Sequence, residues 1–152
     1  MVGLISKIEN WIDETLESYS NQMVSCKQFA SYFDGYFSEK YLSKCFYAVV
    51  KELPKPDFPE LREAGFDNFI DDEHAGITYK NCYFVTAEQE DNLFLHLHEI
   101  THVCQWDILG AEKFIEMYMD ELVKHGYDDA PLEQIAKAIE YNYANQDDPI
   151  DV

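Results

Sequence analysis

One His-Glu-x-x-His sequence, at residues 98–102, restricts both the fold and the chemistry of this chain. An α-helix turns about 100° per residue, so His98 and His102 lie one turn apart on the same face. Two imidazoles on one helix face can bind the same metal ion. Ile100 and Val103 beside them are uncharged, as expected for a helix inside the protein. The pentapeptide therefore predicts a buried helix that supplies two ligands of a zinc (Zn²⁺) site.

Glu99, between the two histidines, is placed to act as a general base. Its side chain turns about 100° from His98 and about 60° from His102, so the carboxylate can reach past the imidazoles. Zinc held by neutral imidazoles lowers the pKa of its water to roughly 7, and a nearby carboxylate removes the proton during attack on a carbonyl. The alternative is a surface helix that carries these three residues by chance, but its uncharged flanks favour the metal site.

Length, composition and charge restrict the class of protein. We expect a single domain over residues 1–152, because this length can bury one core. Apolar residues make up 47% of the chain and aromatic residues 15%, which excludes a disordered chain. The net charge of −19 repels nucleic acid and anionic membranes, so we expect neither as a partner. A solvated acidic surface explains this charge better than steering of cationic partners.

The cysteines and the N-terminus bear on the cellular location of the protein. The four cysteines form no Cys-x-x-Cys pair, so we expect free, buried thiols. Cys104 lies about 200° around the helix from His102 and is expected to pack rather than to bind metal. The N-terminus lacks an apolar stretch with a cleavage site, and no apolar run approaches about 18 residues. A cytoplasmic location is the default expectation.

The N-terminal third is predicted to be helical. Apolar residues spaced by three and four predict a helix over residues 3–23. Aromatic residues at similar spacing, after a sequence that resembles a capping box at Ser25, predict a second helical stretch over residues 25–53. These two stretches form an N-terminal helical part over residues 1–53. A proline-rich segment, residues 54–74, is predicted to be an irregular connection.

The second half, residues 76–145, is expected to form the core around the metal site. β-Branched and aromatic residues over 77–85 predict one or two strands, with a hairpin turn at residues 80–81 as one option. Three helices are expected to follow: one from Asp91 or Asn92 to Leu109 before Gly110, one over residues 111–124, and one capped by Asp128 or Asp129 that continues to about Asn142. Residues 146–152 are expected to fray.

This pattern predicts a mainly helical α+β fold, with a small sheet or hairpin packed beside the metal helix. A catalytic zinc site with two histidines also requires a third protein ligand and an open position for water. Glu133 lies 31 residues after His102, in the first turn of a helix that can fold back along the metal helix, and is the favoured ligand. Asp128, Asp129 and Glu140 are alternatives, and Glu140 shares the helix face of Glu133.

The motifs of this half resemble those of a group of small, mostly uncharacterised bacterial zinc metallopeptidases. In that group His-Glu-Leu-x-His-Val-x-Gln-Trp-x-x-Leu-Gly is followed by Gly-Tyr-x-x-x-Pro-Leu-Glu, and residues 98–110 and 126–133 carry similar sequences. The resemblance covers about residues 76–140 and does not extend to residues 1–60. It implies a gluzincin-like zincin fold with the glutamate of Pro-Leu-Glu, here Glu133, as the third ligand.

The resemblance also implies an activity, which is hydrolysis of a peptide or protein substrate. Zinc would be held by His98, His102 and Glu133, with Glu99 as general base. Larger gluzincins carry an acidic residue four positions after the third ligand, but that position is Lys137 here, so a histidine must be oriented by another residue. The alternative hypothesis is a noncatalytic zincin-fold module for interaction or assembly, whose zinc is structural or vestigial.

Peptide hydrolysis also needs a donor for the developing oxyanion. The residues that can serve are Tyr118, Tyr127, Tyr141 and His125, and the sequence does not select among them.

Two further histidines and one strand complete the set of candidate residues. His96 lies about 160° from His98 on the helix, so it is not expected to be a ligand. His74 lies in a loop and has no assigned role. Zincins pair an edge strand with an extended substrate, and residues 77–85 are the candidate for that strand.

Overall fold

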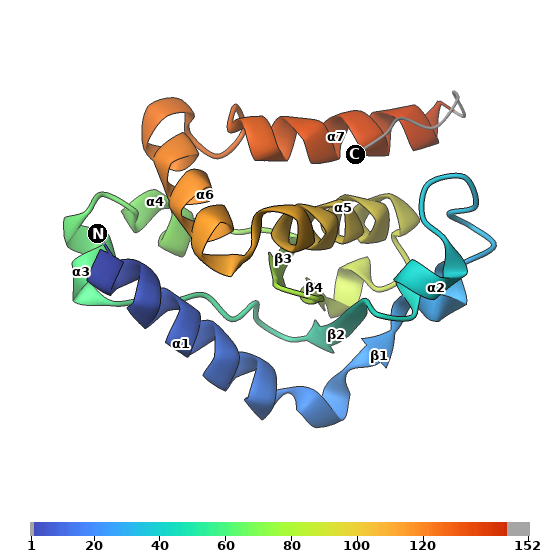
Figure 1. Cartoon of the computed structure of the whole chain (residues 1–152), viewed down its shortest axis with the longest axis horizontal. Helices are drawn as coiled ribbons and strands as arrows, with labels where there is room; N and C mark the ends of the chain where they lie inside the picture. Colours follow the sequence, from blue (N-terminus) through green and yellow to red (C-terminus); the bar gives the residue numbers. More distant parts are fainter. Residues whose placement is uncertain (1, 146–152) are drawn as a thin grey trace.

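A computed structural model describes residues 2–145 and places the pentapeptide in helix α5 (Leu93–Leu109) (Figure 1). Residues 96–103 of this helix are all buried. The Asn92 side chain caps its first turn, and Gly110, with a φ of 82°, ends it. The predicted metal helix is confirmed at both ends.

Three further long helices pack around α5 and the sheet: α1 (Val2–Ser18), α6 (Ala111–His125) and α7 (Pro131–Ala144). Helix α7 runs alongside α5, and α1 packs against α6 (Figure 1). Helices α6 and α7 confirm the two predicted C-terminal helices. Helix α1 ends earlier than predicted, because the 3-10 helix η1 (Ser20–Gln22) follows it.

Four short strands form a mixed sheet: β1 (Val24–Ser25), β2 (Phe46–Val50), β3 (Gly76–Tyr79) and β4 (Cys82–Thr86). Their order is β1-β2-β4-β3, in which β2 and β4 are parallel and the other two pairs are antiparallel. Strands β3 and β4 form the predicted hairpin, with its turn at Lys80 and Asn81. Strand β3 therefore lies at one edge of the sheet.

Strand β2 shows that the predicted second helical stretch over residues 25–53 is wrong. This range contains the 3-10 helix η2 (Cys26–Phe29), the single-turn helix α2 (Glu39–Leu42) and then β2. Ser25 does cap a helix, but its side chain accepts the Lys27 N–H at the start of η2. The aromatic and β-branched residues of β2 suit a strand, and pairing with β4 in the sheet interior outweighs their helical spacing.

Successive residues of β4 point to opposite faces of the sheet and join two different hydrophobic clusters. Cys82 and Phe84 lie in a cluster with residues of α1 and α6. Tyr83 and Val85 lie in a second cluster, with Leu97 and other residues of α5. Both faces of the sheet are thus buried, and α5 packs on the face opposite α1.

The segment between β2 and β3 was predicted to be irregular, but it contains two short helices, α3 (Pro59–Glu63) and α4 (Asp67–Asp71). The Arg62 guanidinium connects them through ion pairs of 2.8, 2.9 and 2.8 Å with Asp57, Asp67 and Asp71. A 3-10 helix, η3 (Ala87–Gln89), lies between β4 and α5.

The architecture confirms a mainly helical α+β fold with a small sheet beside the metal helix. All four cysteines are free, as predicted; Cys26, Cys45 and Cys82 are also buried, whereas Cys104 is only half-buried. Within residues 2–145, no helix combines the length and the apolar character needed to cross a membrane. The predicted fraying of residues 146–152 lies outside the described residues.

The start of α7 depends on a side chain from α6. Ala130 precedes the helix and offers no side-chain cap, so the predicted cap by Asp128 or Asp129 is wrong. Instead Glu121, buried on α6, accepts a 2.8 Å hydrogen bond from the Leu132 N–H. This carboxylate satisfies one of the free N–H groups of the first turn and lies near the positive end of the helix dipole.

Replacing Glu121 with alanine should lower the free energy of unfolding by about 1 to 2 kcal/mol, the usual cost of a lost helix cap. Glu116→Ala is the matched control, because Glu116 is exposed on the same helix and should change stability by less than about 0.5 kcal/mol. Urea denaturation of the two variants and the unmodified chain measures the difference. Equal stability of both variants would contradict the capping role of Glu121.

Candidate metal centre

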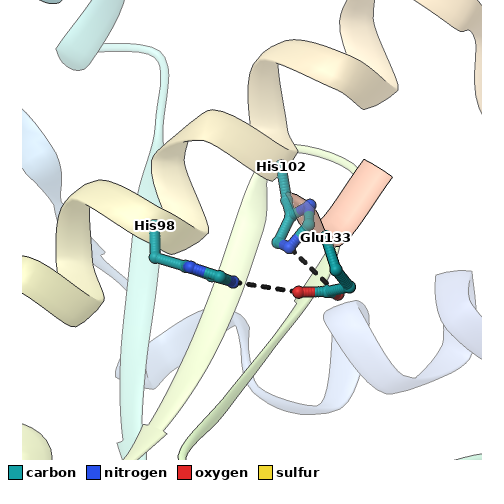
Figure 2. Close-up of side chains that lie close together, drawn as sticks. All are labelled: His98, His102 and Glu133. Carbon is teal, nitrogen blue, oxygen red and sulfur yellow. Dashed lines mark hydrogen bonds and ion pairs between the residues drawn. The ribbon is translucent and has the colours of Figure 1, made fainter. Parts of the chain in front are cut away.

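Three buried side chains from two helices converge on one point. Helix α5 contributes His98 and His102, and α7 contributes Glu133 (Figure 2). Nε2 of His98 lies 3.0 Å from Oε1 of Glu133, and Nε2 of His102 lies 3.1 Å from Oε2. One nitrogen or oxygen from each residue lies within 4.8 Å of the others. The two helices therefore present a His-His-Glu group that could hold a metal ion.

The hydrogen bonding of this group fits a metal. His102 Nε2 is buried without a hydrogen-bond partner among the described residues and lies 3.1 Å from Oε2 of Glu133 in an ion-pair contact. A buried nitrogen without a hydrogen bond is costly, and metal coordination would satisfy it. Two imidazole nitrogens and one carboxylate are also a ligand set of catalytic zinc sites. The residues present thus suit a divalent first-row metal.

Glu140 orients the first histidine. The Nδ1–H of His98 donates to Oε1 of Glu140 at 3.0 Å, which leaves Nε2 facing Glu133. Histidine ligands usually donate their second N–H to a carboxylate or carbonyl, which fixes the ring. Glu140, an alternative ligand from the sequence, lies outside the group and supports it instead. Glu140 thus provides the carboxylate that orients a histidine. Lys137 does not take this role, since its ammonium group donates to the Asp128 carbonyl at 3.1 Å.

Gln105 orients the second histidine and selects its tautomer. Its Nε2 donates to the Leu132 carbonyl at 3.0 Å, so its Oε1 faces His102 Nδ1 at 2.7 Å. An amide oxygen only accepts hydrogen bonds, so Nδ1 of the neutral ring must carry the proton. The lone pair of His102 then lies on Nε2, on the side of Glu133. Sequence reasoning missed Gln105, although its spacing of three from His102 indicates a contact on one helix face.

Tyr118 fixes the position of the Glu133 carboxylate. Its hydroxyl donates a 2.7 Å hydrogen bond to Oε2 of Glu133. Burial, together with the charge of Glu133, raises the pKa of Tyr118 well above its ordinary value, so the hydroxyl remains a donor. Tyr118, one of the four candidate oxyanion donors, is therefore engaged in positioning Glu133.

The pKa values of the group follow from burial and opposite charge. Burial lowers the pKa of His98, but hydrogen bonds with Glu133 and Glu140 outweigh it and raise the pKa to about 10. Burial also lowers the pKa of His102, and the Glu133 charge reverses that effect. Burial raises the pKa of Glu133, but the two histidines reduce it far below its usual range. A binding metal must therefore displace protons from the imidazoles.

Glu99 is buried beside this group and is fixed by strand β3. The Thr78 hydroxyl donates to Glu99 Oε1 at 2.7 Å and also contacts the Glu99 carbonyl at 3.2 Å. A Cβ on Gly76 would lie 3.1 Å from Glu99 Oε2 and 3.2 Å from its Cγ and Cδ. These contacts are tighter than usual for a Cβ, so a larger residue here would make the Glu99 side chain move by a few tenths of an ångström. Burial raises the pKa of Glu99, although the neighbouring histidines oppose this.

A cavity of about 100 Å³ adjoins the centre. Glu99, His102 and Glu133 form part of its wall, and the rest of the wall is mainly apolar. Glu99 and two of the three possible metal ligands thus face one cavity.

The candidate oxyanion donors separate into two pairs. Tyr118 and Tyr127 line the cavity, whereas Tyr141 is 70% exposed and His125 is exposed at the end of α6; neither of these lines it. His74, which had no role from the sequence, also lines the cavity, with its ring centroid 4.7 Å from that of Tyr127. Nothing in its spacing could have indicated this, because the loop before β3 is positioned by the fold.

The other predicted residues lie away from the metal group. Asp128 and Asp129 are exposed, and Cys104 is half-buried outside the group. His96 is fully buried, where Nε2–H donates to the Glu90 carbonyl at 2.7 Å and Nδ1 accepts the Tyr83 hydroxyl at 2.6 Å. His96 is thus a core residue, and it lies outside the His98, His102 and Glu133 group.

No protein-family model, curated protein or solved structure matches the chain. The resemblance of its motifs to bacterial metallopeptidases therefore stays a prediction, and the geometry of His98, His102 and Glu133 supports a metal site independently of it.

Replacing Glu140 with alanine should weaken metal binding by about 10- to 100-fold, the usual effect of removing the hydrogen-bond partner of a histidine ligand. Competition with a chromogenic chelator measures the affinity. Tyr141→Ala is the control, because Tyr141 is adjacent in sequence but exposed, and it should leave the affinity unchanged. If the two variants bind zinc equally well, Glu140 does not support His98.

Metal affinity should rise with pH between 7 and 9. The pKa of His98 is about 10 in the metal-free protein, so each bound ion displaces at least one proton at neutral pH. The apparent affinity should increase by about tenfold per pH unit for each proton displaced. Calorimetric titration in two buffers of different ionisation enthalpy counts the protons. A heat that is independent of the buffer would show that no proton leaves.

Proposed function

We propose that this protein is a zinc-dependent hydrolase, and specifically a metallopeptidase with a gluzincin-like zincin site. The observation that carries the proposal is the cavity on which Glu99, His102 and Glu133 meet. A general base and two members of a His-His-Glu group share this space, which a purely structural metal site does not require. His98, His102 and Glu133 would hold the zinc.

Each residue then has a defined task. Bound zinc supplies the Lewis acidity that activates water and polarises a substrate carbonyl at neutral pH. Glu99 accepts the proton of the attacking water, and since Thr78 already bonds Oε1, the acceptor is Oε2. Tyr127, His74 and Trp106 line the cavity with groups that can donate a hydrogen bond to the developing oxyanion. Tyr118 keeps the Glu133 carboxylate in place.

The position of β3 supports a peptide as the substrate. This strand is an edge of the sheet, and all four of its residues line the cavity beside Glu99. The free side of an edge strand can pair with an extended peptide through main-chain hydrogen bonds. A peptide bound in this way would pass the metal centre.

A noncatalytic metal-binding module is the second candidate. Its support is the burial of the centre, since His98, His102 and Glu133 are 6%, 5% and 3% exposed. A structural site is typically closed, whereas a catalytic site must admit substrate. The two functions differ in whether the zinc-loaded protein cleaves peptides.

Glu99→Gln should retain about one zinc per chain but lower peptide hydrolysis by about 100-fold or more, because the general base is lost. A mixture of internally quenched peptides serves as substrate, and elemental analysis gives the zinc content. Glu90→Gln is the control, since Glu90 is exposed and close in sequence. Hydrolysis that survives in Glu99→Gln would overturn the mechanism. A zinc-loaded, unmodified protein without hydrolysis would favour the noncatalytic module.

Gly76→Ala should reduce hydrolysis by about tenfold or more without loss of zinc, because the added Cβ forces Glu99 to shift. Gly3→Ala is the matched control, as a Cβ there meets nothing within 4 Å. The ratio of kcat/KM values, measured at equal zinc content, reports the effect. Equal activity of the two variants would show that Glu99 does not need this position.

A further inference from the structure

The cavity beside the metal centre is lined mostly by apolar side chains. Apart from Glu99, His102, Glu133, Thr78, Tyr118, Tyr127 and His74, its wall consists mainly of aliphatic and aromatic side chains from α1, α3, α4, β3, α5 and α6. Those on α1 and α6 include Ile8, Ile12, Phe114, Ile115, Met119 and Leu122. The polar groups therefore lie at one region of a largely apolar space.

The size of the cavity restricts what it can hold. Its volume is about 100 Å³. A cavity needs a volume of roughly 10 to 15 Å³ to hold one water molecule, and an apolar cavity of about 150 Å³ binds benzene. Apolar walls leave water with few hydrogen-bond partners, so an apolar group is the better occupant. The space suits a branched aliphatic side chain.

We propose that this cavity is a specificity pocket that accepts a branched aliphatic side chain of the substrate next to the cleaved bond. The proposal rests on the metallopeptidase function proposed above. It follows from the continuity of the apolar wall with Glu99, His102 and Glu133, because a group bound there is within reach of the metal centre. Charged side chains are excluded, since the wall away from the centre offers them no compensating charge.

The proposal gives the N-terminal helix a role in the site. Ile8 and Ile12 of α1 are 6% and 1% exposed and form part of the pocket wall. The metal-site core was predicted over residues 76–145, and no contact between α1 and a substrate was predicted. The side chains of α1 thus help to define the size of the group that fits.

The cavity wall also contains a tryptophan whose fluorescence can report binding. Trp106 lines the cavity, and its indole N–H is buried without a hydrogen-bond partner. The chain has two tryptophans, and the other, Trp11, packs on Tyr79. In a Trp11→Phe background, the fluorescence of Trp106 alone should respond when the pocket is filled.

Hydroxamic acids that differ only in their acyl group test the pocket on the zinc-loaded protein. Acetohydroxamate measures the metal centre alone, because its methyl group is too short to fill the pocket. Isovalerohydroxamate adds a branched chain, and each buried methylene contributes a factor of about four in affinity. We expect it to bind about tenfold or more tightly than acetohydroxamate and to change Trp106 emission. A hydroxamate ending in a carboxylate should gain nothing.

Two variants that fill the pocket test whether the preference for isovalerohydroxamate arises there. Leu122→Trp should bring the two affinities within about threefold, while acetohydroxamate binding stays unchanged. Val123→Trp is the control, because Val123 is 66% exposed and does not line the cavity, and it should keep the preference. If Leu122→Trp no longer binds acetohydroxamate, Ile115→Phe is used instead, and it too should bring the affinities for the two hydroxamates within about threefold.

The outcomes separate this proposal from the proposed function. Equal binding of the two hydroxamates to the unmodified protein overturns the pocket and leaves the metal centre intact. A preference that persists in the filled variant, or tight binding of the carboxylate compound, also overturns it. Failure of acetohydroxamate to bind contradicts the metal centre itself, and the pocket proposal falls with it.

Discussion

The contact of one buried carboxylate with two imidazoles is the constraint on which the rest of this structure depends. Glu133 is 3% exposed and faces both His98 and His102. Burying charged groups costs several kcal/mol each unless opposite charges or hydrogen bonds compensate. The compensation requires α7 to lie against α5 in one register. Leu132, the residue before Glu133, forms a hydrogen bond through each of its backbone groups. Its N–H donates to Glu121, and its carbonyl accepts from Gln105.

Local patterns in the sequence predicted the elements whose structure is decided locally. Helix α5 has both a capping residue, Asn92, and a terminating glycine, Gly110, and the hairpin has its turn at the predicted dipeptide. Strand β2 was missed because its aromatic and aliphatic residues suit either a helix or a strand. Pairing with β4, more than 30 residues further along the chain, favours the strand over the helix. The spacing of apolar residues within one segment carries no information about such a distant partner.

The candidate site divides in the same way. The histidine spacing brought His98, His102 and Glu99 together on one helix, and the Pro-Leu-Glu motif pointed to Glu133. The residues that orient them were not predicted in that role. Glu140 was noted only as another carboxylate on the right helix face, and Gly76 only as the boundary of a strand. Their functions exist because α7 and β3 are placed beside α5, which is a property of the tertiary fold.

A diffraction experiment at the zinc absorption edge, on crystals of the protein loaded with one equivalent of zinc, tests the central claim most directly. The account predicts a single strong anomalous peak at about 2.0 to 2.2 Å from Nε2 of His98, Nε2 of His102 and the Glu133 carboxylate, with a coordination position open to the cavity. A peak at other residues, no peak, or a fourth protein ligand that closes the site would contradict it.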